Sequence, residues 1–167
     1  MDLRNRFESR TTFQLLRAEY AVALAVSIVL FLLNIDQVNW LLAITLFVYI
    51  DLIGYLPGAI AYRRSATRRI SRIYYVLYNT MHSLVTQAAV VGVLVLLWGW
   101  NWAMLSVVIH LAGDRALFGN FLKSFRVPFE PEVLPEFSEF DERTAEAPAR
   151  SAATGPTATT AWTGGTS

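Results

Sequence analysis

The chain has 167 residues and no cysteine, and only 16% of its residues are charged, while 54% are hydrophobic. Without a thiol, the sequence excludes a disulfide scaffold, a cysteine-ligated metal and thiol catalysis. Soluble domains carry about 25% charged residues, and the mean hydropathy of +0.40 excludes disorder over the whole chain. The apolar excess therefore needs a place other than the core of a small soluble domain.

Charge is unevenly placed as well as scarce. Residues 1–126 hold 12 Lys or Arg and 6 Asp or Glu, whereas residues 127–167 hold 2 and 7. A basic, apolar body thus carries an acidic tail, and this balance gives no indication of a nucleic-acid partner. We predict a transmembrane domain over 1–126 and a largely disordered cytoplasmic tail over 127–167, acidic first and then rich in Ala, Thr and Gly.

The longest uncharged run predicts two membrane crossings. It covers 41 residues between Arg72 and Asp114, which as helix would measure roughly 60 Å, about two hydrocarbon thicknesses of ~30 Å. Its middle reads Trp-Gly-Trp-Asn-Trp over 98–102, and Trp prefers the membrane interface. We therefore expect a helical hairpin of 73–97 and 103–121 that turns at one membrane face.

The first half repeats this pattern and completes an all-α fold. An uncharged run is followed by a polar turn at 34–39, so helices are expected over about 13–34 and 40–62. Pro57 and Gly58 interrupt the second of these helices, and a kink is expected there because proline removes a backbone hydrogen bond. The prediction is a polytopic membrane protein with four transmembrane helices in a four-helix bundle.

Arginine positions predict the orientation. The N-terminal segment and the loop before residue 73 are rich in arginine, whereas the turns 34–39 and 98–102 have none. Positively charged loops stay in the cytoplasm, so we expect both termini there, in a multi-pass protein of the bacterial inner membrane. The loop could also bind anionic lipid through Arg63, Arg64, Arg68, Arg69 and Arg72. The phenylalanine-containing stretch 129–142 is expected to bind a protein partner or to dock on this loop.

Polar residues within the predicted spans converge on one depth. Counted from the cytoplasmic ends of their helices, Asp51, His82 and His110 lie 10 or 11 residues in, which is ~15–17 Å and near the bilayer midplane. Three further polar residues lie somewhat nearer the cytoplasm: Glu19, Asn79 and Asp114. Ionisable side chains in a membrane are costly, so each marks a candidate functional site.

The spacing of these residues indicates a metal site. His110 and Asp114 are four residues apart and share a helix face. Two imidazoles and two carboxylates, from these residues with His82 and Asp51, are ligands suited to Zn²⁺, Mn²⁺ or Fe²⁺, and helical bundles hold such sites on facing helices. The ion would activate water against a lipid-borne ester or phosphoester, with Asp51 as fourth ligand or base.

The enzyme hypothesis gives two more residues a role, and two other functions stay open. Asn79 and Arg115 would orient or neutralise an anionic substrate group. In a non-enzymatic membrane scaffold, the same cluster only locks the helices together, and Asp114 pairs with Arg115. A small transporter or proton path would use the same side chains. Alanine at His82 separates the first two, because it abolishes activity in the enzyme and lowers stability in the scaffold.

Three stretches carry a resemblance to a known family. They are Asp51-Leu-Ile-Gly-Tyr-Leu-Pro-Gly-Ala59, Tyr78-Asn-Thr-Met-His82 and His110-Leu-Ala-Gly-Asp-Arg-Ala-Leu117. With them, residues 40–123 resemble an uncharacterised family of small bacterial integral membrane proteins, a domain of unknown function. The family pattern ends in Gly-x-Gly-Leu-Lys, to which Gly119-Asn-Phe-Leu-Lys123 is similar but offset. The resemblance implies a four-helix membrane fold and no known activity.

A second resemblance rests on His82-Ser83 and on His110-x-x-x-Asp114. These strings look like motifs of the membrane-bound metal-dependent hydrolases of bacterial inner membranes, although the further His and Asp motifs expected near the N-terminus are missing. This resemblance implies a metal at the two histidines and adds to the metal hypothesis.

Overall fold

The computed structural model describes residues 8–153, and residues 1–7 and 154–167 lie outside the described part. The chain divides into two compact units, of which the first ends at Pro131 and the second begins at Glu132. The first unit, a helical bundle, therefore extends past Arg126, where the change of charge predicted its end.

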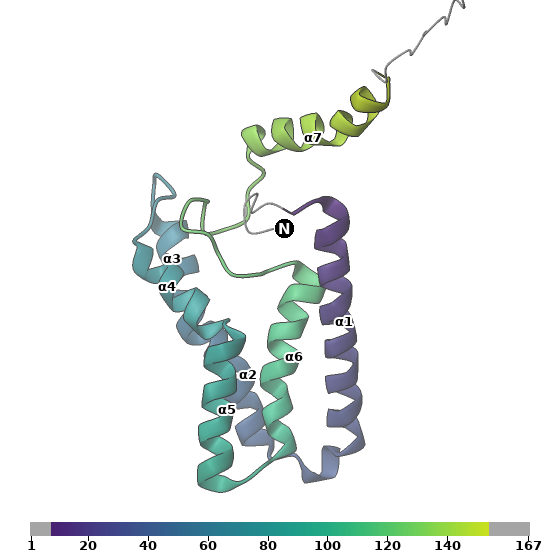
Figure 1. Cartoon of the computed structure of the whole chain (residues 1–167). Coiled ribbons are helices and arrows are strands. Elements are labelled where there is room, and N and C mark those ends of the chain that lie inside the picture. The colour runs from purple at the N-terminus through teal and green to yellow at the C-terminus, as the bar shows by residue number, and fades with distance from the viewer. Residues whose placement is uncertain (1–7, 154–167) are drawn as a thin grey trace, which may run out of the picture. The chain divides into compact units, whose positions relative to one another are not determined.

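The bundle is built from helices, as predicted, and no strand occurs in the described residues. In chain order these are α1 (Arg10–Leu33), α2 (Trp40–Gly54), α3 (Leu56–Arg64), α4 (Arg72–Met81), α5 (Leu84–Trp98) and α6 (Leu105–Gly113). Short 3-10 turns precede α2 and α6, and a π-helical turn, Asp114–Phe118, extends α6. Helix α6 packs against both α1 and α2 (Figure 1).

Three helices begin where a polar side chain replaces the missing backbone acceptor. Ser9, Asn39 and Ser71 precede α1, α2 and α4, and each accepts a hydrogen bond from a backbone N–H two or three residues further on. Such caps satisfy donors that the first helical turn leaves open. The predicted interruption of the second helix is confirmed, because Tyr55 separates α2 from α3.

The described helices account for two or three of the four predicted spans by length and composition. Arg10–Leu33 and Trp40–Arg64 are each long and apolar enough to cross a membrane, and α4 with α5 forms a third if the bent pair is one span. The fourth predicted span, 103–121, contains only the nine residues of α6 flanked by short helical turns.

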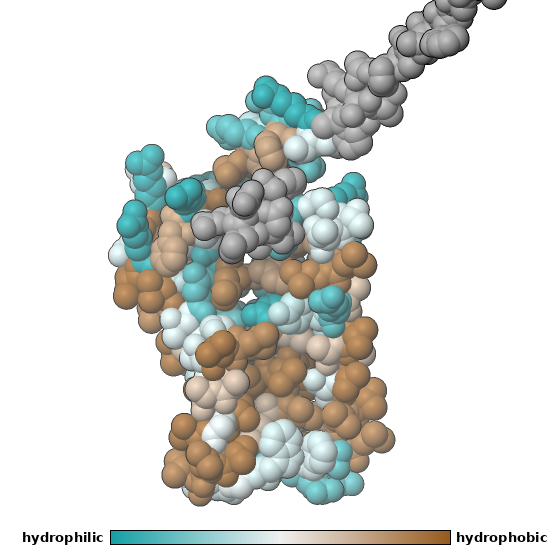
Figure 2. Space-filling model, viewed as in Figure 1, coloured by the Kyte–Doolittle hydropathy of each residue, from teal (hydrophilic) through white to brown (hydrophobic). Residues whose placement is uncertain are grey.

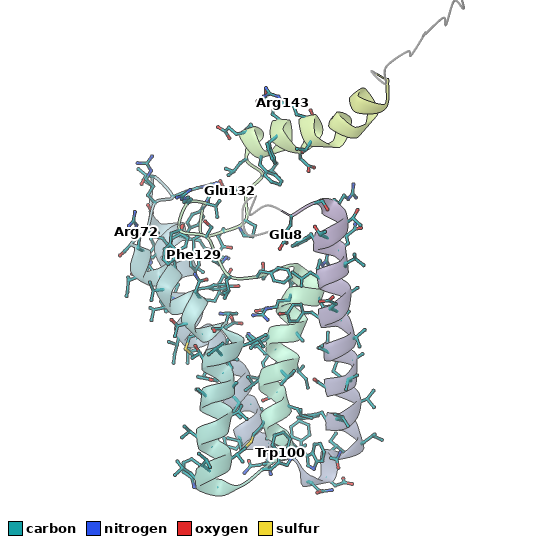
Figure 3. All side chains as sticks on the ribbon, viewed as in Figure 1. Glu8, Arg72, Trp100, Phe129, Glu132 and Arg143 are labelled. Atoms are coloured by element: carbon teal, nitrogen blue, oxygen red, sulfur yellow. The ribbon has the colours of Figure 1, made fainter. Side chains whose placement is uncertain are left out.

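Both ends of the bundle are polar, but one end carries tryptophan and the other carries arginine. Figure 2 shows apolar side chains over most of one lateral face and hydrophilic side chains at both ends. Trp100 marks one end, and Arg72 lies at the opposite end (Figure 3). The arginines of the 63–72 loop are all exposed. This is the separation of indole and arginine that the sequence predicted.

One predicted helix, 73–97, is broken. The chain bends by 53° between α4 and α5, at His82 and Ser83. The break leaves carbonyl groups without a partner in the helix, and two side chains donate hydrogen bonds to them. Gln87 Nε2 donates to the Met81 carbonyl at 2.6 Å, and an Arg115 Nη donates to the His82 carbonyl at 3.0 Å. The expectation of a continuous helix was wrong because these partners stabilise a break without proline or glycine.

Gln87→Ala is expected to destabilise the bundle by about 1–3 kcal/mol, because it leaves the Met81 carbonyl without its donor in an apolar interior. Gln87 is only 1% exposed, and its Oε1 also accepts a hydrogen bond from the Tyr49 hydroxyl. Thermal unfolding in detergent would measure the change. Val85→Ala, at a side chain 81% exposed, is the control, and equal losses in both variants would contradict the role of Gln87.

After the π-helical turn, residues 119–131 return across the end of the bundle, and we call them the capping segment. Gly119, with φ +68°, allows the reversal, since few other residues adopt this conformation. Phe129 is fully buried and packs on Gly58, Tyr75 and Tyr78. Phe129 thus fills a gap in its own bundle, in a cluster against which Ile70 of the 63–72 loop also packs. That 129–142 binds a protein partner stays a prediction.

The second unit differs from its prediction over 135–153, where helix α7 (Pro135–Ala153) stands in place of a disordered tail. Proline is favoured in the first turn of a helix, and the segment that follows is rich in the strong helix formers Glu and Ala. Glu139 and Arg143 form an ion pair one turn apart. Val133 and Phe137 are exposed. The remainder of the predicted disordered stretch, 154–167, lies outside the described residues.

Candidate metal centre

Four side chains from three parts of the bundle meet in its interior. Asp51 comes from α2, His82 follows α4, and His110 and Asp114 come from α6 and the turn that extends it. His82 Nε2 lies 3.3 Å from both Asp51 Oδ1 and Asp114 Oδ2. His110 Nε2 lies 3.7 and 3.6 Å from the same two oxygens. The predicted convergence of these four residues is confirmed.

The imidazole nitrogens of the cluster are buried, and within the described residues one of the four makes a hydrogen bond. Each histidine side chain is only 4% exposed. Within the described chain, Nε2 of both histidines and Nδ1 of His110 have no hydrogen-bond partner. His82 Nδ1 donates to the Tyr78 carbonyl at 3.0 Å, so Nε2 faces the two carboxylates and is the atom that can ligate a cation when the ring is neutral. Buried polar atoms without a partner are costly, and a cation between the carboxylates and the two Nε2 atoms would satisfy both Nε2 atoms.

The distances suit a metal ion. One ligand atom from each residue lies within 4.8 Å of all the others. With bonds of about 2.0–2.1 Å, the ligand atoms of a tetrahedral zinc site lie about 3.3–3.4 Å apart. The separations of 3.3 Å from His82 and of 3.6 and 3.7 Å from His110 are close to this value. The Asp, His, His, Asp group could therefore hold a metal ion.

Neighbouring residues fix both imidazole rings. Tyr78 stacks on His82 with ring centroids 4.0 Å apart, and Phe47 meets His110 edge-on at 4.8 Å. Gly54 lies so close that a Cβ there would be 3.2 Å from the His82 ring. Ligand orientation thus depends on packing and on the hydrogen bond to Tyr78, which is how outer contacts tune metal sites.

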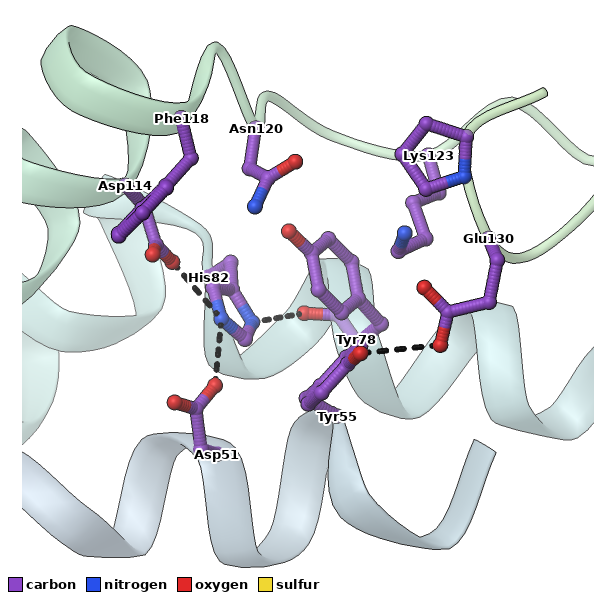
Figure 4. Close-up of a pocket in the computed structure, with 10 residues that line it drawn as sticks. Asp51, Tyr55, Tyr78, His82, Asp114, Phe118, Asn120, Lys123 and Glu130 are labelled. Carbon is purple, nitrogen blue, oxygen red and sulfur yellow. Dashed lines mark hydrogen bonds and ion pairs between the residues drawn. The ribbon is translucent and has the colours of Figure 1, made fainter. Parts of the chain in front are cut away.

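A pocket of about 260 Å³ opens beside the cluster under the capping segment. Figure 4 shows Asp51, His82 and Asp114 at one end of it, and Lys123 and Glu130 at the other. The Asp51 side chain is 48% exposed and that of Asp114 is 19% exposed, because both border this pocket. The full lining is Asp51, Tyr55, Tyr78, His82, Asp114, Phe118, Asn120, Lys123, Glu130 and Pro131.

The other predicted site residues lie around the cluster. Asn79 Nδ2 donates a hydrogen bond to the Lys123 carbonyl at 2.9 Å, and Asn79 Oδ1 accepts one from the Lys123 backbone N–H at 2.7 Å. Arg115 donates to the Tyr20 hydroxyl at 2.7 Å as well as to the His82 carbonyl. Both residues therefore position the framework of the site, and neither belongs to the pocket lining. Glu19 is exposed on α1.

The outer half of the pocket was not predicted from the sequence. Glu130, assigned to the acidic tail, accepts a hydrogen bond from the Tyr55 hydroxyl at 2.9 Å. Lys123 Nζ donates to the Phe129 carbonyl at 2.5 Å and lies 4.6 Å from the centroid of the Tyr78 ring. Burial lowers the pKa of the Lys123 ammonium, and the nearby carboxylate of Glu130 opposes this shift. The one sequence signal for this half of the pocket is Lys123, the single lysine of the sequence, which follows the last apolar helix.

Comparison with known proteins adds no relative. No family model, curated protein or solved structure matches the chain. The two resemblances noted from the sequence stay predictions, and function has to be argued from the cluster and its pocket.

Proposed function

We propose that the protein is a membrane-embedded, metal-dependent hydrolase acting on a lipid-borne ester or phosphoester. The observation that carries this is the convergence of two buried imidazole Nε2 atoms on two carboxylates beside an open pocket. The pocket also gives the cluster access to a second molecule, which a closed structural metal site lacks.

We propose zinc as the ion, because two imidazole nitrogens and two carboxylate oxygens are a ligand set that suits four-coordinate Zn²⁺ better than Mn²⁺ or Fe²⁺, which take more ligands. His82, His110 and Asp114 are the three permanent ligands. Asp51 has the most exposed side chain of the four, so it is assigned as general base and not as a permanent fourth ligand.

Bound zinc would lower the pKa of water and polarise the substrate oxygen. Asp51 takes a proton from the attacking water, whose oxygen forms a bond to the carbonyl carbon or to phosphorus. The bond to the leaving alcohol oxygen breaks, and Asp51 returns the proton to that oxygen. The net reaction consumes one water and needs no redox partner.

The proposed setting is the bacterial inner membrane, crossed four times by α1, α2 with α3, α4 with α5, and α6 with its two flanking helical turns, with both termini in the cytoplasm. The arginine loop and the tryptophan turn lie at opposite ends of the bundle (Figure 3), which supports this orientation. The five exposed arginines over 63–72 would hold anionic lipid headgroups. The capping segment follows α6 at the arginine end, so substrate would enter from the cytoplasmic leaflet.

Asp51→Asn tests the assignment of the base. The variant keeps an oxygen facing the cluster but cannot accept the proton, so lipid hydrolysis is expected to fall by about 10²–10⁴-fold while zinc content stays near that of the wild type. Hydrolysis would be followed with zinc-loaded protein in mixed micelles of phospholipid or of an ester-linked lipid. An unchanged rate would contradict the role of Asp51. Wild-type protein that binds zinc and hydrolyses neither lipid class would favour the scaffold.

A further inference from the structure

We propose that the pocket binds a phosphate group between Lys123 and the metal centre, so that the substrate class is a small phosphate-bearing group. This inference rests on the proposed function and names the substrate of the same site. The phosphate could belong to a lipid headgroup or to a water-soluble molecule.

The first support is the position of Lys123. Among the residues that line the pocket, it is the one lysine or arginine, and its side chain points into the pocket from the end opposite the metal ligands (Figure 4). An ammonium has three N–H donors, and the Phe129 carbonyl takes one of them. The Tyr78 and Phe129 rings hold the ammonium at 4.6 Å from each centroid.

The second support is the charge balance. Asp51, Asp114 and Glu130 border the pocket together with Lys123, so three carboxylates oppose one ammonium and an anion would be repelled. A divalent ion at the cluster cancels this excess and removes the repulsion. Metal and phosphate should therefore bind cooperatively, each raising the affinity for the other.

The third support is size. The pocket volume of about 260 Å³ lies just below the range of about 300–1,000 Å³ for drug-sized ligands. This space fits a headgroup, whereas acyl chains would remain in the bilayer. Asn120, whose amide faces the same space in Figure 4, offers a further donor to a phosphate oxygen.

The experiment is calorimetric titration of inorganic phosphate into the zinc-loaded, full-length protein in detergent. Lys123→Met should weaken binding by about 10- to 100-fold, the value of one charge-assisted hydrogen bond, and Lys123→Arg should restore most of it. Glu130→Gln keeps the acceptor for the Tyr55 hydroxyl but removes the competing charge, so phosphate should bind more tightly. Removal of zinc should weaken phosphate binding in the wild type.

Opposite effects at the two positions separate anion binding from folding. If Lys123 and Glu130 only held the capping segment in place, both substitutions would weaken phosphate binding, and that result would overturn the inference. Equal affinity in the wild type and Lys123→Met would also overturn it. Zinc content is measured on the same samples: wild type without zinc overturns the proposed function, whereas zinc-loaded wild type without phosphate binding overturns only this inference.

A competition experiment distinguishes the two sources of phosphate. Dioleoyl phosphatidate is added to the detergent micelles, with dioleoyl phosphatidylcholine as the control lipid. Displacement of inorganic phosphate by phosphatidate alone would assign a lipid phosphate monoester to the pocket. Persistence of phosphate binding in both lipids would assign a water-soluble ligand, and both results support a phosphate site.

Discussion

His82→Gln and His110→Gln are each expected to weaken zinc binding by more than about 100-fold, because loss of a ligand exceeds the 10- to 100-fold cost of losing one of its supporting contacts. Glutamine keeps a polar group in the interior, where each imidazole is only 4% exposed, so the bundle should stay folded. Zinc retained after dialysis would be measured by mass spectrometry, with helicity followed by circular dichroism.

The alanine variants distinguish a site from a structural network. In the metal centre, His82→Ala loses zinc and activity, and zinc raises the unfolding temperature of the wild type but not that of the variant. In a scaffold, His82→Ala lowers the unfolding temperature whether or not zinc is present. Full zinc binding by both glutamine variants would show that the ion, if present, is held elsewhere.

Gly58→Ala is expected to displace the capping segment. A Cβ at this position would lie 2.8 Å from two carbons of the Phe129 ring, and that ring is fully buried, so it has to move. Overpacking of this kind costs about 1–3 kcal/mol. Displacement of Phe129 also removes the carbonyl that holds Lys123, so phosphate binding should fall together with the unfolding temperature.

Two further variants test whether the loss comes from the contact between residue 58 and the Phe129 ring. A Cβ added at Gly92, on α5, would meet no neighbouring side chain within 4 Å, so Gly92→Ala should be neutral or slightly stabilising. Phe129→Ala alone leaves a cavity and costs about 3–5 kcal/mol. Adding Gly58→Ala to Phe129→Ala should cost almost nothing more, and a full additional loss would contradict direct packing of the two residues.

The four residues of the cluster could be predicted because simple counting along the helices gives their depth. Asp51, His82 and His110 lie at similar distances from the helix ends, and Asp114 shares a helix face with His110. A shift of one or two residues in a helix boundary changes the predicted depth very little. The prediction of the cluster therefore holds although the helix that carries His82 is broken. The same counting put Asn79 into the cluster, but its amide instead takes both hydrogen bonds of the Lys123 backbone.

The break and the capping segment could not be predicted, because both depend on contacts between distant residues. The bend at His82 requires Gln87 and Arg115 to take the freed carbonyls, and Arg115 is 33 residues away from His82. Phe129 and Glu130 looked like part of an acidic tail, since composition does not show that Gly58 leaves room for a ring. Half of the pocket wall was missed for this reason.

The most direct measurement is the zinc content of the detergent-purified, full-length wild type, before and after incubation with zinc followed by dialysis. The geometry of the cluster predicts about one tightly held ion per chain, as expected of a mononuclear site, together with zinc–nitrogen and zinc–oxygen distances in X-ray absorption. A folded wild type that retains no zinc, manganese or iron after incubation with each would contradict the metal centre.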